Sequence, residues 1–155
     1  MGLAGCRPSA HAAAFDLWIE RGAHAGMRWM ASTASVRKDL RTKWPWATVA
    51  LVGALSYLTR PLERQRLPGI ARYVSRYARG SDYHDVLKTR LKAWGDGVER
   101  HAGRAVRRAI LVDTSAVMER ELATRAGLGW VGRNTCLFGA HGDSWRFLGV
   151  ILTTL

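Results

Sequence analysis

The sequence predicts an α/β (α+β) fold, with a mixed sheet and flanking helices in one domain. Apolar runs of strand length alternate with segments whose apolar residues recur at helical spacing, and no internal repeat is present. A length of 155 residues suits one compact domain, and 48% hydrophobic residues supply its core. This composition argues against a disordered basic tail, although 24 Lys+Arg against 12 Asp+Glu give a formal net charge of +12.

The N-terminal third is predicted to hold the end of a strand and two short helices. Residues 1–6 are apolar, as in a strand that ends before Arg7. A helix over 12–22 would carry Phe15, Trp18 and Ile19 on one face, with a glycine at its end. A second short helix begins at 27–30, and a basic stretch follows over 37–43.

The clearest strand is predicted over residues 48–58. It lies within the longest apolar run, 47–58, which is too short for the roughly 20 residues of a membrane-spanning helix. Pro61, Pro68 and several charges then predict a loop over 59–69.

A long helix is predicted over 83–103, with Asp82 as its N-cap. Its apolar residues fall on one face, while lysines and arginines occupy the rest of its surface; the apolar positions are Leu87, Leu91, Trp94 and Val98.

The C-terminal third is predicted to alternate strands with one helix. We expect a buried strand at 109–112, a helix at 115–126, a glycine-rich loop that leads to 135–138, and a final strand over 145–153.

Cysteine usage and charge limit the class of protein. Cys6 and Cys136 are too few for a disulfide framework or a four-ligand zinc or iron–sulfur site. We expect two reduced thiols, with a single bridge as the alternative. No secretory signal is recognisable, so we expect a cytoplasmic protein. The positive charge favours a polyanionic partner, with nucleic acid first and an anionic membrane second.

The glycines of Gly127-Leu-Gly129-Trp-Val-Gly132 fit the dinucleotide pattern G-x-G-x-x-G. That pattern needs a strand before it and a helix after it, and here the predicted order is reversed. The glycines are better explained as a helix end and as points of close approach to a ligand or a neighbouring strand.

Two polar segments lie near the start of the long helix, one before it and one at its first residues. Arg79-Gly80 predicts a tight cationic turn that could contact phosphate or carboxamide groups. Asp82-Tyr-His84 is followed by Leu87 where the cobalt-ligating pattern D-x-H-x-x-G has glycine, so His84 is not predicted to ligate cobalt. The alternative interpretation is a helix cap beside an aromatic residue and a histidine.

Asp113 stands between a predicted strand and a predicted helix. A carboxylate there is commonly an N-cap, worth about 1 kcal/mol. The same junction, at the carboxyl end of a strand, is also where α/β folds place reactive groups. As a proton donor Asp113 would need burial against apolar groups, and Glu119-Arg120 offers a charge partner one turn on.

Several segments together resemble the N-terminal, cobalamin-binding half of the epoxyqueuosine reductases. The resemblance rests on Trp18-Ile-Glu-Arg-Gly-Ala-His-Ala-Gly-Met-Arg-Trp-Met30 and, in order, on residues 77–91, 112–120, 125–135 and 145–154. Each piece is unspecific alone, but their joint order and spacing cover nearly the whole chain.

The resemblance implies a reductase that converts epoxyqueuosine to queuosine in the anticodon loop of tRNA, with base-off cobalamin and two [4Fe–4S] clusters. It also implies a fold related to the flavin nitroreductases, with an antiparallel or mixed sheet. By motif position, Asp113 would be the general acid, Arg120 would contact the substrate or the cofactor, and Arg79 would contact the substrate. The remaining predicted positions contact the corrin: Tyr83, His84, Asn134, Thr135, and the backbone at Gly129 and Gly132.

The sequence also departs from the family. The cysteine runs of its ferredoxin-like module and its helical repeats are absent. We therefore expect residues 1–155 to be one cobalamin-binding domain, incomplete at both ends and inactive without an external electron donor. We expect a cytoplasmic monomer with tRNA as its partner and no membrane attachment.

Two other functions stay open. A non-catalytic basic RNA-binding module would bind tRNA without a cofactor, with an affinity that falls steeply with salt. A flavin-binding nitroreductase-like protein would carry a yellow cofactor. The matched motifs favour the cobalamin-dependent branch over the flavin branch.

Overall fold

A computed structural model describes residues 1–58 and 69–155. Its strands are β1 (Gly2–Gly5), β2 (Val49–Ser56), β3 (Arg108–Leu111), β4 (Trp130–Val131), β5 (Leu137–Phe138) and β6 (Arg146–Thr153). Its α-helices are α1 (Ala12–Glu20), α2 (Arg28–Ser32), α3 (Ala34–Lys38), α4 (Tyr83–Ala102) and α5 (Glu119–Arg125). Short 3-10 turns lie at Leu40–Thr42, Gly69–Tyr73 and Arg76–Ala78. The predicted loop over 59–69 lies outside the described residues, except for Gly69.

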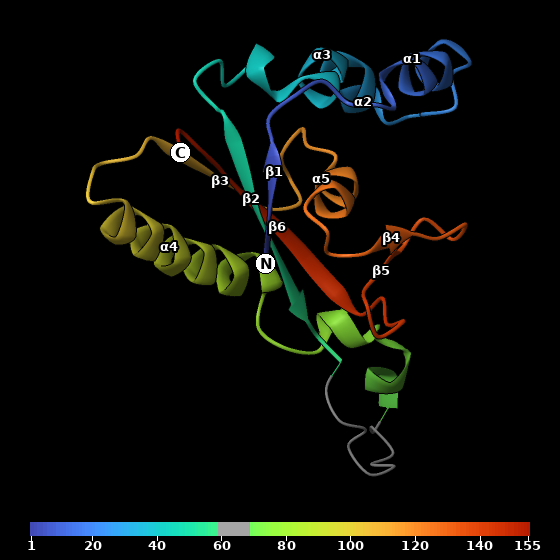
Figure 1. Cartoon of the computed structure of the whole chain (residues 1–155). Coiled ribbons are helices and arrows are strands. Elements are labelled where there is room, and N and C mark those ends of the chain that lie inside the picture. The colour runs from blue at the N-terminus through green and yellow to red at the C-terminus, as the bar shows by residue number, and fades with distance from the viewer. Residues whose placement is uncertain (59–68) are drawn as a thin grey trace.

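The core is a four-stranded sheet in the order β1-β2-β6-β3 (Figure 1). All three of its ladders are antiparallel, so of the antiparallel and mixed arrangements expected, the antiparallel one is observed. A two-stranded β4–β5 hairpin stands apart from this sheet. The α+β class is therefore confirmed.

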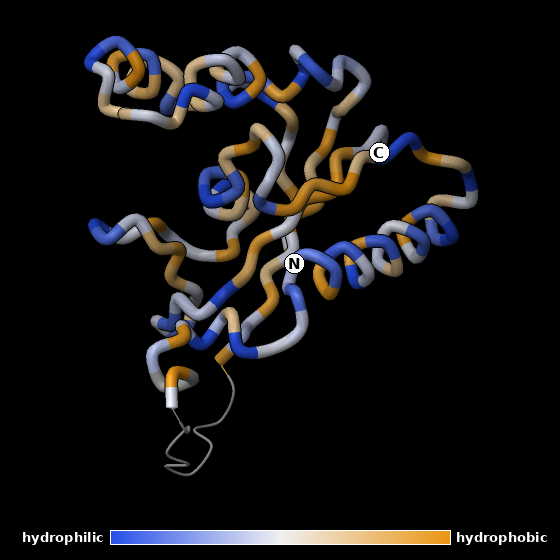
Figure 2. The backbone as a smooth tube through the Cα atoms, turned by 180° about the vertical axis from the view of Figure 1, so that it is seen from behind, coloured by the Kyte–Doolittle hydropathy of each residue, from blue (hydrophilic) through white to orange (hydrophobic). Residues whose placement is uncertain are grey.

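Side-chain alternation in the central strands builds two apolar layers. Ala50 and Val52 of β2 pack in the cluster that contains α5, whereas Leu51 between them packs in the cluster that contains α4. Figure 1 shows α4 on one side of the sheet and α5 on the other. In Figure 2 the crossing strands are largely hydrophobic, while α4 alternates between hydrophilic and hydrophobic turns.

Helix α4 matches its prediction closely. Asp82 caps it by accepting a hydrogen bond from the His84 backbone N–H at 2.8 Å. Gly103 ends it in the left-handed conformation, with φ +64. Leu87 and Leu91 on its inner face are 3% exposed, so the helical spacing did identify the buried side.

One helix prediction needs correction, and another is confirmed. The helix expected over 115–126 begins only at Glu119, because Asp113 adopts φ +48 and the chain then turns tightly, with the Val117 N–H bonded to the Ser115 carbonyl at 2.8 Å. The second short helix, expected to begin at 27–30, is confirmed as α2; the separate helix α3 follows after Thr33, whose hydroxyl donates to the Trp29 carbonyl at 2.5 Å.

Candidate active site

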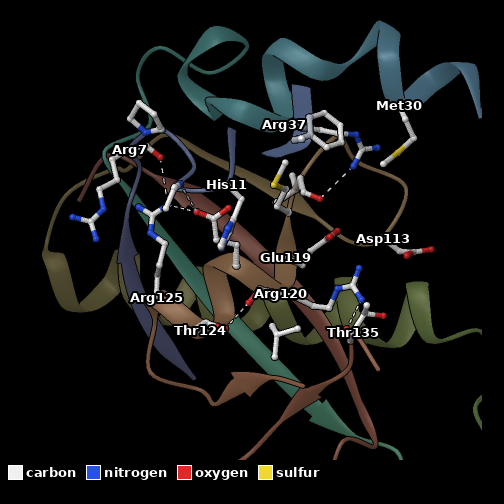
Figure 3. Close-up of a pocket in the computed structure, with 17 residues that line it drawn as sticks. Arg7, His11, Met30, Arg37, Asp113, Glu119, Arg120, Thr124, Arg125 and Thr135 are labelled. Atoms are coloured by element: carbon white, nitrogen blue, oxygen red, sulfur yellow. Dashed lines mark hydrogen bonds and ion pairs between the residues drawn. The ribbon is translucent and has the colours of Figure 1, made fainter. Parts of the chain in front are cut away.

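A cavity of about 870 Å³ lies between α5 and the helices α1 to α3 (Figure 3). One end holds Arg7, His11 and Arg125, and the other holds Asp113, Glu119, Arg120 and Thr135. Apolar side chains complete its walls: Phe15, Met30, Val117 and Val131. The volume lies in the upper part of the range of roughly 300–1,000 Å³ for ligand pockets. Three predicted site residues line the cavity: Asp113, Arg120 and Thr135.

Asp113 lies where the chain leaves β3, immediately after the buried residue Val112. Its φ of +48 is rare for a residue with a side chain and puts it in a turn rather than in a helix. The N-cap of α5 is Met118, so the interpretation of Asp113 as a helix cap is wrong. Its carboxylate instead accepts a hydrogen bond from the Tyr83 hydroxyl at 2.9 Å and lies 3.4 Å from His84 Nε2. The Asp113 side chain is 62% exposed, so the burial expected from the sequence for a proton donor is not observed.

His84 lies between two carboxylates. Its Nδ1 is 2.7 Å from Asp82 Oδ1, and its Nε2 faces Asp113. The hydrogen bond with Asp82 raises the pKa of His84, with a further contribution from Asp113, although desolvation opposes both. In turn, the hydrogen bonds from His84 lower the pKa of Asp82. The arrangement favours an imidazolium that donates toward Asp113.

Tyr83 is fixed by stacking on both sides. Its ring lies 4.1 Å from the His84 ring and 4.3 Å from the Phe147 ring, which is parallel to it within 3°. Burial, followed by the hydrogen bond to Asp113, raises the pKa of Tyr83 to about 12. The phenol therefore stays protonated at neutral pH and remains a donor to Asp113.

Glu119 is a second carboxyl group in the cavity wall, which the sequence predicts only as a charge partner. Its Oε1 is buried without a hydrogen-bond partner among the described residues. Burial raises the pKa of Glu119 to about 7; the Asp113 charge also raises it, while Arg37 and Arg120 lower it. This carboxyl is therefore partly protonated near neutral pH.

Arg120 connects α5 to the β4–β5 hairpin by donating to the Thr135 carbonyl. Thr135 adopts φ +63 in the turn of this hairpin. The side chain of Asn134 accepts a hydrogen bond from the Cys136 N–H at 3.2 Å, so it stabilises the same turn.

The glycines of the hairpin are explained by packing between its own strands. A Cβ at Gly129 would lie 1.8 Å from the Phe138 carbonyl oxygen, and one at Gly132 would lie 2.7 Å from the Phe138 ring. Of the two approaches expected for these glycines, the approach to a neighbouring strand is the one observed. Gly129, Gly132 and Asn134 do not line the cavity, so their contact with a corrin stays a prediction.

Arg79 lies apart from the Asp113 cavity, in a second hollow beside Trp145. Its Nε donates to the Val74 carbonyl at 2.7 Å. Tyr83 and His84 are brought to Asp113 itself rather than to the cavity wall. Sequence reasoning did not anticipate the contributions of Arg37 and Phe147, because tertiary packing alone brings them near.

Metal-binding and membrane-spanning features are both missing from the part of the chain that the structure describes. No three His, Cys, Asp or Glu side chains there are close enough together to hold a metal ion. Cys6 and Cys136 are free thiols, one buried and one exposed, as the sequence favoured. No helix within residues 1–58 and 69–155 is long and apolar enough to span a membrane.

The sequence matches the family described as "Epoxyqueuosine reductase QueG, DUF1730" over residues 37–114. The matched region contains Asp113, which lines the cavity, and Tyr83 and His84, which contact its carboxylate. The chain therefore belongs to the epoxyqueuosine reductase family.

Individual relatives agree with this assignment. The epoxyqueuosine reductase of Gloeobacter violaceus is 41% identical over 138 residues, which are 89% of this chain and 41% of that protein. The structure of epoxyqueuosine reductase from Streptococcus thermophilus has a TM-score of 0.80 at 23% identity and covers 99% of this chain and 41% of its own. A structure of epoxyqueuosine reductase with an epoxyqueuosine-modified tRNA-Tyr stem loop has a TM-score of 0.79 at 23% identity, with 99% and 40% covered. The chain thus spans about 40% of the length of these relatives.

Proposed function

We propose that this chain is the cobalamin-binding part of an epoxyqueuosine reductase, with Asp113 as the proton donor. The observation that carries the proposal is the Asp113 carboxylate at one end of the cavity, contacted by Tyr83 and His84 within the region matched to the family. The proposed substrate is epoxyqueuosine in tRNA, and the proposed product is queuosine.

The cavity suits a large cofactor that carries amide groups, as cobalamin does. Apolar walls at Phe15, Met30 and Val131 can contact a flat macrocycle, while arginines at its rim can donate to amide carbonyls. Arg120 and Thr135 would contact the cofactor or the substrate. Bound there, cobalamin would supply the reducing equivalents that open the epoxide.

Asp113 would protonate the epoxide oxygen as its bond to carbon breaks. A carboxyl group can act this way only if it is held toward the leaving oxygen, and the Tyr83 hydroxyl fixes its orientation. His84, in its imidazolium form, would return a proton to Asp113 through Nε2, with Asp82 holding the other ring nitrogen. Tyr83 and His84 are thus positioning and proton-supplying residues.

The proposed partners are tRNA and an external electron donor. The related structure with a modified stem loop supports tRNA, and a formal net charge of +12 favours a polyanion. Two isolated cysteines do not suit a [4Fe–4S] cluster, so electrons would come from groups that the described residues do not hold.

Anaerobic titration with cob(II)alamin tests this function directly. We expect saturable binding with the visible and electron paramagnetic resonance spectra of the base-off form. Arg120→Ala should weaken binding at least threefold, and the exposed substitution Glu20→Gln serves as control. Folded protein whose cob(II)alamin spectrum is unchanged at all concentrations would contradict the proposal.

The basic composition also favours a second candidate, a non-catalytic RNA-binding module. It predicts stem-loop binding without any response to cobalamin. The same titration separates the two candidates, because only the reductase changes the cofactor spectrum.

A further inference from the structure

A second cavity, of about 480 Å³, lies beside the junction of β2 and β6, away from α1 to α3. Figure 1 shows the short 3-10 turns of residues 69–78 at this end of the sheet. We call it the Trp145 cavity; it is lined by Tyr57, Ser75, Arg76, Tyr77, Arg79 and Trp145. Among the described residues, this lining contains two guanidinium groups, three aromatic rings and no carboxylate.

The aromatic and cationic groups of the Trp145 cavity are both accessible and ordered by contacts. The guanidinium carbon of Arg76 lies 5.2 Å from the centre of the Trp145 ring. The Trp145 and Tyr77 side chains are 41% and 50% exposed, respectively. Within the described residues, neither Arg76 nor Arg79 forms an ion pair, so their charges are available to an anion.

This combination matches the chemistry of single-stranded RNA. Unstacked bases bind on aromatic rings and on the flat face of arginine, each base contributing roughly 1–3 kcal/mol. Phosphates bind arginine through charge-assisted hydrogen bonds. An aromatic cavity with two guanidinium groups that form no ion pair with any described residue therefore suits a nucleotide better than an apolar ligand.

A continuous series of contacts between aromatic rings connects the Trp145 cavity to Asp113. The Trp145 ring meets Tyr57 edge-on at 5.7 Å, and Tyr57 lies 4.5 Å from Phe147. Phe147 stacks on Tyr83, whose hydroxyl bonds Asp113. Because these rings are closely packed, we expect the distance between the two cavities to change little.

We infer that the Trp145 cavity binds a nucleotide of single-stranded RNA that flanks the nucleotide reacting at Asp113. A base would stack on Tyr77 or on the outer face of Arg76, and a neighbouring phosphate would contact Arg79. The inference rests on the proposed function in one respect, the choice of tRNA as partner. Its consequence is that the flanking nucleotide positions the RNA loop relative to the larger cavity.

The inference is tested with two independent double variants. Fluorescence anisotropy measures the affinity of each for an unmodified tRNA-Tyr anticodon stem loop. The pair Arg76→Gln and Arg79→Gln should weaken binding at least tenfold and reduce the slope of log affinity against log salt by one to two. The pair Tyr77→Ala and Trp145→Leu should weaken binding at least fivefold with little change in that slope.

The matched control is Arg90→Gln with Lys92→Gln, which removes two exposed positive charges from α4. We expect its affinity to stay within twofold of the wild type. The inference is overturned if the arginine pair behaves like this control, or if the aromatic pair binds the stem loop as the wild type does. Circular dichroism and thermal melting verify that each variant folds.

The cob(II)alamin titration is repeated on all variants to separate this inference from the proposed function. Unchanged cofactor binding by variants with weakened RNA binding supports a separate RNA subsite. If cobalamin does not bind the wild type but the aromatic and arginine effects persist, the proposed function fails while the RNA subsite stands. Parallel loss of both binding activities in folded variants would contradict a separate subsite.

Discussion

Asp113 combines an unusual backbone with an ordered side chain. A left-handed φ costs roughly 1–3 kcal/mol for a residue with a Cβ, and such strain is retained only where the surroundings enforce it. Here the buried residue Val112 precedes it and the Tyr83 hydroxyl holds its carboxylate. A helix-capping role would require neither the left-handed φ nor the hydrogen bond from Tyr83. These two features instead support the proposal that Asp113 donates a proton.

Replacement of Asp113 by asparagine should separate binding from chemistry. The amide oxygen of Asp113→Asn can still accept from Tyr83, but the side chain has no carboxyl proton to donate. With chemically pre-reduced cobalamin and an epoxyqueuosine stem loop, we expect single-turnover reduction to slow at least 100-fold. Mass spectrometry follows loss of the oxygen, and anisotropy should report unchanged RNA affinity. Wild-type rates in this variant would refute the assigned role.

Glu119 should make stability depend on pH between about 4.5 and 7. Its pKa is raised from 4.5 to about 7 in the folded protein, so the stability that its neutral form contributes is present below pH 4.5. That contribution is lost as pH rises through 7. At about 1.4 kcal/mol per pKa unit, the loss is on the order of 3 kcal/mol.

Urea unfolding at a series of pH values measures this effect. Glu119→Gln cannot ionise, so its decline in stability from pH 4.5 to 7.5 should be smaller by that amount. Glu20→Gln removes the same charge from an exposed position of α1 and should keep the wild-type slope. A Glu119→Gln variant that follows the wild-type curve would exclude a protonated Glu119.

Among the secondary-structure elements, helix α4 packs into a shallow depression of the sheet, which forms where two glycines lack side chains. Gly53 of β2 and Gly149 of β6 are paired neighbours, and both face the leucines of α4. A Cβ on Gly149 would lie 2.6 Å from Leu91 Cδ1 and 3.0 Å from Leu87 Cδ2. The absence of two side chains lets the helix approach closely, and α4 in turn carries Tyr83 and His84 to Asp113.

Gly149→Ala should therefore destabilise the protein through overpacking. We expect a loss of about 1–3 kcal/mol in the free energy of unfolding, because the leucines are buried and must shift. Gly5→Ala is the matched control in β1, where a Cβ would meet nothing within 4 Å. Chemical denaturation compares the two variants; equal stabilities would show that the depression is not needed for the packing of α4.

Local signals predicted the regular elements well and the site only in part. The apolar spacing at Leu87 and Leu91 and the cap at Asp82 have causes within a few residues, so α4 was predicted almost to its ends. The left-handed turn at Asp113 has no such local signal, and the helix after it was started too early. The contact of Tyr83 with Phe147 joins α4 to β6, and only the tertiary fold reveals it.

Over the whole molecule, positive charge exceeds negative charge by twelve. Among the described residues some ion pairs are local, such as Arg41 with Asp39 and Arg146 with Asp143, and others, such as Lys38 with Asp16, join distant segments. The remaining cations repel one another in the folded state, which is a destabilising contribution that salt screens.

Raising NaCl from 20 to 300 mM should therefore increase the melting temperature by several degrees. Over this range the screening length falls from roughly 20 Å to below 10 Å, so distant repulsion is removed. Differential scanning fluorimetry gives the trend, and an equal osmolality of sucrose controls for non-ionic effects. A melting temperature that falls with NaCl would show that local attractive pairs dominate instead.

The position of β6 in the sheet bears on how the protein is made. This strand bonds to both β2 and β3, yet it is synthesised on the order of 100 residues after β2. At about 5–20 residues per second, the nascent chain holds the apolar β2 without its main partner for roughly 5–20 s. Through that interval β1 is the one described strand available to pair with β2, so the other edge of β2 stays open to non-native association until residue 153 has emerged.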